Sequence, residues 1–296
     1  MQLDVFGFAT SVDGLVEDVA AAAAQGFSRF WTPQIRDLDA LTAFAVVGRE
    51  VPDIRLGTNV VPTWVRHPTM LAQQAITVNQ AIGGRLDLGI GLSHKPVVEG
   101  FWGIPFERPV RHMSDYLKVL MPLLNGEPAS HTGEMVSGRM ELGIRADPAP
   151  VFVAALGEQM LKLAGRYADG TTTWMTGPVT LETLTGPTLR AAAADADRPE
   201  PQLLAAVPVL LTNDVEAARA RAAKDYEIYG VLPSYRTMLD REGLDGPADL
   251  AIVGDEAAVE AGLRRFDAAG ATTVIANPFG TDAEVARTRE FLASLA

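Results

Sequence analysis

The sequence contains no cysteine, few lysines and no long hydrophobic run, and each shortage excludes a class of protein. Without cysteine, the 296 residues can form neither a disulfide framework nor a thiolate metal site. No apolar run approaches the roughly 18 residues that a membrane-spanning helix needs. The N-terminus runs directly into the strand-like QLDVFGFA, without the basic, apolar and small-residue pattern of a secretory signal. We therefore expect a soluble, cytoplasmic protein.

Positive charge is also scarce. The formal net charge is -12, and nucleic acids and anionic membranes both require a basic face, so neither is an expected partner. Among the four histidines, His112 and His131 have no partner at metal-ligand spacing, and we expect no metal site. The expected partner is a small-molecule substrate, and any anionic part of a ligand must be bound locally.

Short apolar runs alternate with segments of helical periodicity along the whole chain. Because helices cover both faces of such a sheet, its strands read as nearly continuous apolar runs. The expected strands are Leu3 to Phe8, Phe30 to Thr32, Ile54 to Val61, Leu86 to Ile90, Val151 to Ala155, Gly170 to Met175, Leu203 to Leu211 and Thr273 to Ala276. Eight repeats in this length predict one α/β domain, residues 1–296, folded as a (β/α)8 TIM barrel.

Helix signals fit between these strands, and two stretches are longer than the repeat needs. Gly26 and the pair Gly83-Gly84 are placed to end helices, Pro68 lies in a first turn, and Thr281 or Asp282 is placed to begin the last helix. HTGEMVSGRMELGIRADPAP, before strand five, predicts hairpin-like turns. IYGVLPSYRTMLDREGLDGPADLAIVGD, before strand eight, predicts helical or irregular structure. Insertions of this length often form substrate lids.

Chemistry in a TIM barrel gathers at the C-terminal ends of the strands, so the residues there are best considered together. They contain few carboxylates and many small residues, amides and aromatics, which suits a flat conjugated ring better than hydrolysis or a divalent metal. The set comprises 7–9, 32–34, 59–62, 91–94, 154–157, 174–176 and 277–280.

The stretch RLDLGIGLSHKP, residues 85–96, partly matches two well-known motifs and completes neither. A dinucleotide-binding fingerprint needs a third glycine where His94 stands, and it belongs after a first strand rather than a fourth. A serine-hydrolase elbow needs glycine where Lys95 stands. Both functions are therefore disfavoured.

Several motifs resemble those of the luciferase-like superfamily, and the similarity covers nearly the whole chain in order. They are RLGTNVV, GGRLDLGIGLSHKP, PVFVAALGEQMLKLAGRYADGTTTWMTGP and VIANPFG. The similarity is greatest to the branch that uses the deazaflavin coenzyme F420. The resemblance implies a cofactor-binding set of Phe8, Gln34, Asn59, Val60, Gly91, Leu92, Ser93, His94, Ala154, Ala155, Leu156, Gly157 and Trp174, with His94 and Gln34 as catalytic candidates.

Two further features follow from the resemblance. The third strand should end in a bulge with a non-prolyl cis peptide at Asn59-Val60 that supports the middle ring of the cofactor; the alternative is an ordinary β-bulge. The cofactor phosphate should meet backbone N–H groups at the helix start after Gly157, which on the alternative interpretation only begins a helix. Glu158 must then point away from the phosphate.

Two positions differ from the pattern of the family. Many deazaflavin enzymes carry Asp-His where this chain has Pro33-Gln34, and glutamine can hydrogen-bond a ring or substrate but cannot transfer a proton. Where relatives carry a proton-active glutamate, this chain has His94, which we expect to exchange the proton that accompanies hydride transfer. The alternative is that His94 only hydrogen-bonds the cofactor or tethers the next loop.

Other residues are open to more than one interpretation. Trp174 either walls the ring or fills the barrel mouth, and Trp31 and Trp64 are expected in a pocket wall or in the core. His67 is expected to cap a helix or lie on the surface. The basic residues Arg66, Lys95 and Arg111 either assist an anionic tail or are solvated surface charges.

The sequence thus predicts an F420-dependent oxidoreductase that transfers a hydride between the deazaflavin and a small organic substrate. The alternatives are an FMN-dependent luciferase-like monooxygenase and a non-catalytic F420-binding protein. We also expect a homodimer, because LDALTAFAVVGRE offers an apolar helical face where the family commonly pairs its barrels. The alternative is that this face packs on the barrel itself.

Overall fold

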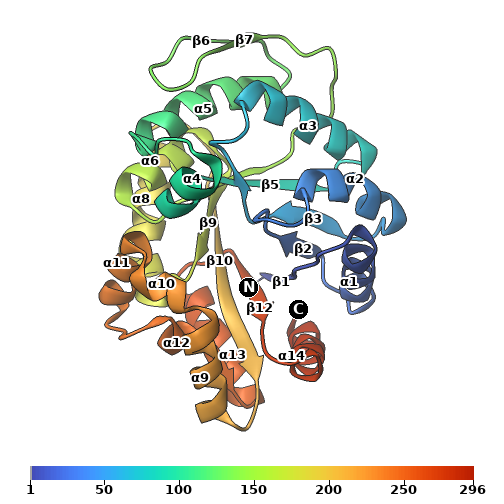
Figure 1. Ribbon diagram of the computed structural model, residues 1–296, viewed down its shortest axis with the longest axis vertical. Coiled ribbons are helices and arrows are strands. Elements are labelled where there is room, and N and C mark those ends of the chain that lie inside the picture. Colours follow the sequence, from blue (N-terminus) through green and yellow to red (C-terminus); the bar gives the residue numbers. More distant parts are fainter. Residues whose placement is uncertain (1) are drawn as a thin grey trace.

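The computed structural model describes residues 2–296, and its parallel strands close into a barrel (Figure 1). The barrel strands are β1 (Gln2–Phe6), β2 (Arg29–Thr32), β3 (Arg55–Thr58), β5 (Leu86–Gly91), β8 (Val151–Ala154), β9 (Gly170–Trp174), β10 (Gln202–Leu211) and β12 (Thr273–Pro278). Each pairs in parallel with the next, and β12 returns to pair with β1, so the sheet has no free edge among these strands. The (β/α)8 barrel and its eight strand positions are confirmed.

Two short strands extend the barrel beyond the expected set. After an irregular step, β4 (Val61–Pro62) continues β3 and pairs with the end of β5. At the other side of the barrel, β11 (Ile252–Gly254) pairs with the last residues of β10.

Helices surround the barrel, and their ends follow the expected signals. Gly26 has φ +93°, Gly83 and Gly84 also have positive φ, and Thr281 begins the last helix with a capping box to Glu284. The helices are α1 (Val12–Ala24), α2 (Ala40–Glu50), α3 (Pro68–Ala81), α4 (Lys95–Trp102), α5 (Pro109–Leu124), α6 (Glu158–Tyr167), α7 (Pro178–Thr180), α8 (Gly186–Ala194), α9 (Val215–Asp225), α10 (Glu227–Val231), α11 (Pro233–Glu242), α12 (Pro247–Leu250), α13 (Glu256–Ala268) and α14 (Asp282–Leu295). A π-helical turn, Leu181–Thr185, joins α7 to α8.

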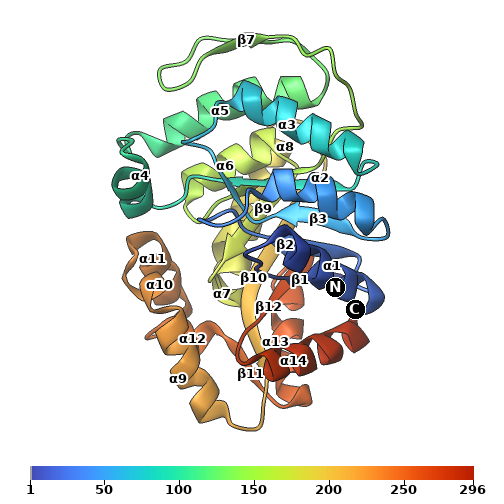
Figure 2. The same ribbon diagram turned by 45° about the vertical axis from the view of Figure 1, so that its right-hand side comes forward.

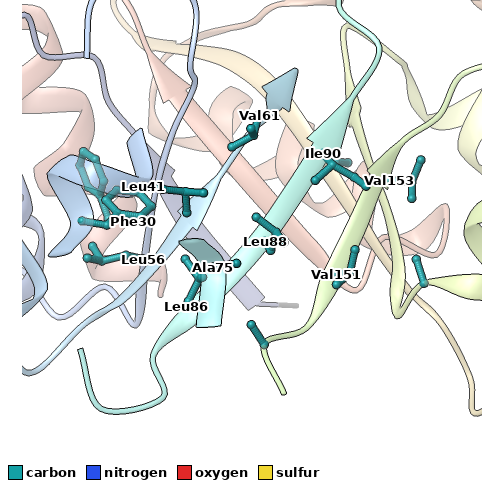
Figure 3. Packing of buried hydrophobic residues seen from close by; sticks show 14 of the residues in the cluster. Phe30, Leu41, Leu56, Val61, Ala75, Leu86, Leu88, Ile90, Val151 and Val153 are labelled. Atoms are coloured by element: carbon teal, nitrogen blue, oxygen red, sulfur yellow. The ribbon is translucent and has the colours of Figure 1, made fainter. Parts of the chain in front are cut away.

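The main hydrophobic core lies between the strands and this ring of helices. Figure 3 shows its part around β5, where Leu86, Leu88 and Ile90 are buried against side chains of neighbouring strands and helices. A second cluster fills the barrel interior and contains Phe6, Trp31, Phe152, Leu204, Ala206 and Ile275. Burial on both faces explains why the strands read as continuous apolar runs.

Buried charges occupy the N-terminal half of the barrel. The Asp4 carboxylate accepts a hydrogen bond from Trp31 Nε1 at 2.8 Å and faces Arg29 Nε at 3.5 Å. Burial raises the pKa of Asp4 to about 6, although Arg29 and Trp31 both oppose the shift. Arg55 binds both oxygens of Asp87 at 2.9 and 3.0 Å. In TIM barrels this end serves stability, so we assign these pairs a structural role.

The first insertion forms the expected hairpin but lies over a helix rather than over the strand ends. Its strands β6 (Ala129–His131) and β7 (Gly138–Met140) pair antiparallel beyond α5 (Figure 1). The buried Asp115 of α5 fixes it, accepting hydrogen bonds from His131 Nε2 and the Met135 N–H, each at 3.0 Å. Burial acts to raise the pKa of Asp115, but these bonds and Arg111 hold it at about 2.

The apolar face of α2 packs on the barrel. Its Leu41, Phe44 and Val47 are fully buried within the chain, while Val46 remains exposed. The homodimer stays a prediction. The apolar face of α2 no longer supports it, because that face is already buried within the chain. No helix within residues 2–296 is both long and apolar enough to cross a membrane.

The close approach of β3 and β5 requires glycine at position 89. A Cβ atom there would collide with the backbone carbonyl of Thr58, whereas one at the exposed Gly143 would meet open space. Because a backbone atom cannot rotate away, we expect Gly89→Ala to destabilise the protein by about 3 kcal/mol, the upper part of the overpacking range. Urea unfolding of Gly89→Ala and of the control Gly143→Ala measures the difference, and equal midpoints would contradict this packing.

Candidate active site

The third strand is interrupted where the cofactor-supporting bulge is expected. The peptide bond between Asn59 and Val60 is cis, and it lies between β3 and β4. At this interruption the Thr58 hydroxyl donates to the Gly89 carbonyl at 2.8 Å and accepts from the Gly89 N–H at 2.9 Å. A side chain thus joins β3 to β5 beside the bulge. The predicted position and geometry of the Asn59-Val60 pair are confirmed.

The bulge contacts β9 and β5 at the C-terminal rim, and β8 lies on the other side of Gly91. Asn59 Oδ1 accepts a hydrogen bond from Thr172 Oγ1 of β9 at 3.2 Å. At Gly91, a Cβ atom would lie 2.6 Å from Val60 Cγ2 and 3.1 Å from the Ala154 side chain. Gly91 therefore leaves only a narrow space between the bulge and β8, and the structure brings Asn59, Val60, Gly91 and Ala154 together as the sequence predicted.

The start of α6 offers free backbone donors at the same rim. Gly157 is the N-cap residue, and no side chain caps this helix end. A helix N-terminus without a cap leaves N–H groups that can bind an anion. Glu158 is exposed and pairs with Lys162 at 2.6 Å, so it does not occupy this position. The expectation that Glu158 points away is met.

Aromatic side chains from the second insertion and from Tyr226, at the end of α9 just before it, meet the end of β9. The half-buried Trp174 stacks on Phe6 at 6.3 Å and meets the edges of Tyr226 and Tyr229, each at 5.8 Å. Tyr235 packs against Tyr229 at 4.9 Å. We call Tyr226, Tyr229 and Tyr235 the tyrosine wall. Trp174 contacts both this wall and Phe6 of the barrel interior, so Trp174 lines the barrel mouth and also fills part of it.

Sequence reasoning missed the tyrosine wall. Three of the five tyrosines lie within YEIYGVLPSY, residues 226–235, and two of them, Tyr229 and Tyr235, are inside the insertion expected to form a lid. That concentration was the available signal, and it supports the lid interpretation for this insertion. Figure 2 shows α10 and α11 on the same side of the barrel as α4, which begins after β5.

His94 stands at the N-cap of α4 with its ring against the tyrosine wall. The ring centroid lies 5.6 Å from Tyr235 and 6.5 Å from Tyr229, and both contacts are edge-on. Its side chain forms no capping bond and no other hydrogen bond within residues 2–296. Burial lowers the pKa of His94 below 6.5, so its ring is mainly neutral at pH 7 and can accept a proton.

Gln34 is less free than expected. Its Oε1 accepts the Ala40 N–H at 3.3 Å, and this is its one side-chain hydrogen bond among the described residues 2–296. No hydrogen bond joins Gln34 to His94 or to the bulge among residues 2–296. Phe8 is 61% exposed, with its ring edge on Phe6 at 5.1 Å. Leu92 and Ser93 are half-buried beyond β5, and Ser93 has a positive φ of 58°.

The two remaining tryptophans were expected in a pocket wall or in the core, and each of these positions is found once. Trp31 is fully buried inside the barrel. Trp64 lines a cavity of about 730 Å³ beside the end of β4. There its ring stacks on His112 at 3.9 Å, and His112 Nε2 is bonded to Thr63 Oγ1 at 3.1 Å. Burial lowers the pKa of His112 to about 4, so this imidazole is neutral and structural.

The basic candidates are all paired within the chain. Arg66 pairs with Asp39, Lys95 lies 3.9 Å from Glu99, and Arg111 binds Asp115. His67 caps α3, as expected. Residues 2–296 contain no group of three or more His, Asp or Glu side chains placed to hold a metal ion.

A comparison with known protein families shows which family the chain belongs to. The model described as luciferase-like monooxygenase matches residues 7–295. The chain belongs to this family. A 5,10-methylenetetrahydromethanopterin reductase of Methanolobus tindarius is 28% identical over 236 residues, which are 79% of this chain and 72% of that protein. A putative coenzyme F420-dependent oxidoreductase of Mycobacterium tuberculosis is 33% identical over 173 residues, 52% of this chain and 49% of its own.

A solved structure extends the likeness over the whole fold of this luciferase-like protein. The coenzyme F420-dependent tetrahydromethanopterin reductase of Methanopyrus kandleri superposes with a TM-score of 0.84 at 21% identity, covering 99% of this chain and 97% of the other. At that identity the likeness concerns the fold, and it supports the barrel and its insertions.

Glu242, at the end of α11, anchors the tyrosine-bearing insertion to the barrel. Its carboxylate accepts the N–H groups of Val179 at 3.1 Å and Thr180 at 2.6 Å, just after β9. Because charge-assisted bonds contribute about 1.5–3 kcal/mol each, Glu242→Ala should speed amide hydrogen exchange across 226–242 by roughly tenfold or more. The control is Glu227→Ala, at the start of α10 and within the same stretch 226–242, where the carboxylate has no partner within residues 2–296. Equal exchange in the two variants would contradict the anchor.

Proposed function

We propose that this luciferase-like protein is an F420-dependent oxidoreductase, which transfers a hydride between the deazaflavin and a small organic substrate. One barrel domain, residues 1–296, would carry the whole activity. The observation that carries the proposal is the shared location of a narrow uncharged cradle at Val60 and Gly91 and an uncapped helix start at Gly157. Coenzyme F420 is named for the mycobacterial relative and for the Methanopyrus kandleri structure, and these names support the deazaflavin as the cofactor.

The residues present fit such a cofactor. Val60, Gly91 and Ala154 offer a surface of small and apolar groups for a flat ring. The backbone N–H groups after Gly157 would hold the phosphate, so a chain of net charge -12 would bind this anion through its backbone. Leu92, Ser93, Ala155 and Leu156 complete the proposed cofactor-binding set around them.

When bound, the deazaflavin supplies a carrier for two electrons and a proton as hydride. His94 would hold or release the accompanying proton at its ring nitrogen, which no other described side chain occupies. Gln34 would orient the ring or substrate through its amide N–H groups, since Ala40 already occupies its oxygen. The tyrosine wall, with Trp174, would exclude water from the reacting atoms.

The cofactor can be identified by titration of the apo protein. We expect quenching of tryptophan fluorescence by F420 at concentrations at least tenfold below those needed for FMN, because Trp174 borders the proposed ring position. Tighter binding of FMN, together with oxygen consumption by the reduced FMN complex, would establish the monooxygenase alternative instead. Tight F420 binding without oxidation of reduced F420 by any enone, imine or nitro acceptor would establish the non-catalytic binder.

The role of His94 can be separated from that of Gln34 by mutation. We expect His94→Ala to lower kcat about 10²- to 10⁴-fold, the usual contribution of general acid–base catalysis, with F420 affinity nearly unchanged. Gln34→Ala should weaken F420 or substrate binding more than it lowers kcat. Steady-state kinetics and F420 titration of both variants give the comparison, and an unchanged kcat in His94→Ala would remove His94 from the mechanism.

The pH profile supplies a readout that a purely structural His94 would not change. In substrate reduction the ring must be protonated to donate, and burial places its pKa below 6.5. Activity should therefore be greatest at low pH and fall as pH rises through that lowered pKa. In substrate oxidation the neutral ring accepts the proton, so the same group should make activity fall as pH decreases. His94→Ala should lose both limbs.

A further inference from the structure

Tyr229 is at the centre of the aromatic contacts beside His94. Its ring lies 4.9 Å from Tyr235, 5.8 Å from Trp174 and 6.5 Å from His94, and it is only half-buried. Tyr226 and Tyr235 are more deeply buried behind it. Tyr229 therefore presents an aromatic surface between the proposed proton donor and the end of β9, where a substrate would have to lie.

The rings that form this surface carry no charge at neutral pH, and the neighbouring acidic residue, Asp225, supplies no positive charge. Burial raises the pKa of all three wall tyrosines, so their hydroxyls stay protonated. His94 is mainly neutral for the reason given above. On the adjoining loops, Lys95 has Glu99 as its partner and the exposed Arg36 contacts none of these rings. An anionic substrate group placed here would lose its hydration without gaining a counter-charge.

Exposed apolar side chains extend this uncharged surface toward the solvent. Phe101 on α4 and Ile228 and Val231 on α10 are among the most exposed large hydrophobic residues, and Val231 is 70% accessible. Figure 2 shows the two helices on one side of the barrel. Phe8 and Ile35, from the loops after β1 and β2, are similarly exposed. Exposed apolar groups that recur in segments following barrel strands suit the entry path of an apolar ligand.

We propose that this mouth takes uncharged, largely apolar substrates with a flat conjugated system, and that Tyr229 is the residue that selects them. The proposal rests on the proposed function, since it specifies the substrate class of the same site. Aromatic faces and edges favour flat conjugated partners, and the uncharged wall rejects carboxylates and phosphates. Tyr235 and Tyr226 support Tyr229 from behind and act as positioning residues.

The test compares two probes with one ring system. Coumarin is flat, conjugated and neutral, while coumarin-3-carboxylate has the same bicycle with a negative charge at pH 7. Calorimetric titration of the F420-loaded protein should show coumarin binding at least tenfold more tightly. Tyr229→Ala should lower coumarin affinity roughly tenfold, Tyr229→Phe should retain most of it, and the control Val215→Ala, at an exposed valine on α9, should leave it unchanged.

A second variant keeps the test independent of any loss of packing in Tyr229→Ala. Tyr229→Arg places a counter-charge at the half-buried position and should invert the preference toward coumarin-3-carboxylate. Equal affinity of the two probes for the native protein would overturn the proposal, as would unchanged coumarin affinity in Tyr229→Ala. Competition between coumarin and F420 would place the probe in the cofactor position and would also overturn it.

The same titrations on the cofactor-free protein separate this proposal from the proposed function. A protein that fails to bind F420 but still prefers coumarin through Tyr229 would refute the F420 assignment and leave the substrate class standing. A protein that binds F420 and discriminates neither probe would refute the substrate class alone.

Discussion

Closure of the parallel barrel, completed where β12 pairs with β1, is the constraint on which the rest of the structure depends. Because all its strands run in one direction, closure brings every C-terminal strand end to one rim. The bulge at Asn59-Val60, the end of β5 at Gly91 and the helix start at Gly157 are far apart in sequence and meet only for this reason. The opposite end carries partly buried ion pairs such as Arg55 with Asp87, to which we assign a structural role.

The C-terminal rim combines a region fixed by backbone packing with a region contributed by helices outside the barrel. Gly89 and Gly91 allow β5 to lie close to the bulge, so that region is fixed by backbone packing. The tyrosine wall comes instead from helices outside the barrel and is linked to it by Glu242. A rigid cradle suits a cofactor of constant shape, whereas an attached wall can vary in its side chains without disturbing the barrel. This division separates the proposed cofactor site from the proposed substrate site.

The sequence predicted the barrel well because its evidence is local. Strand positions, helix ends at Gly26 and Thr281, and the hairpin before strand five follow from periodicity and capping. The position of the cis bond came from resemblance to a family, not from residue chemistry. Contacts over long sequence distances were not predictable, and Tyr229 reaches His94 only through the fold. The hydrogen bond from the Ala40 N–H to Gln34 is local, but it forms in a turn that no sequence pattern signals. The apolar pattern of α2 is the same whether the helix packs on the barrel or on a second subunit, so it could not decide between them.

A crystal structure of the protein with coenzyme F420 is the most direct test of whether the cofactor binds at this rim. We expect the deazaflavin ring to lie against Val60 and Gly91, with one face toward Trp174 and His94. The phosphate should lie on the N–H groups that follow Gly157. A cofactor found elsewhere, for example in the cavity beside Trp64, or a phosphate held by side chains away from α6, would contradict this expectation.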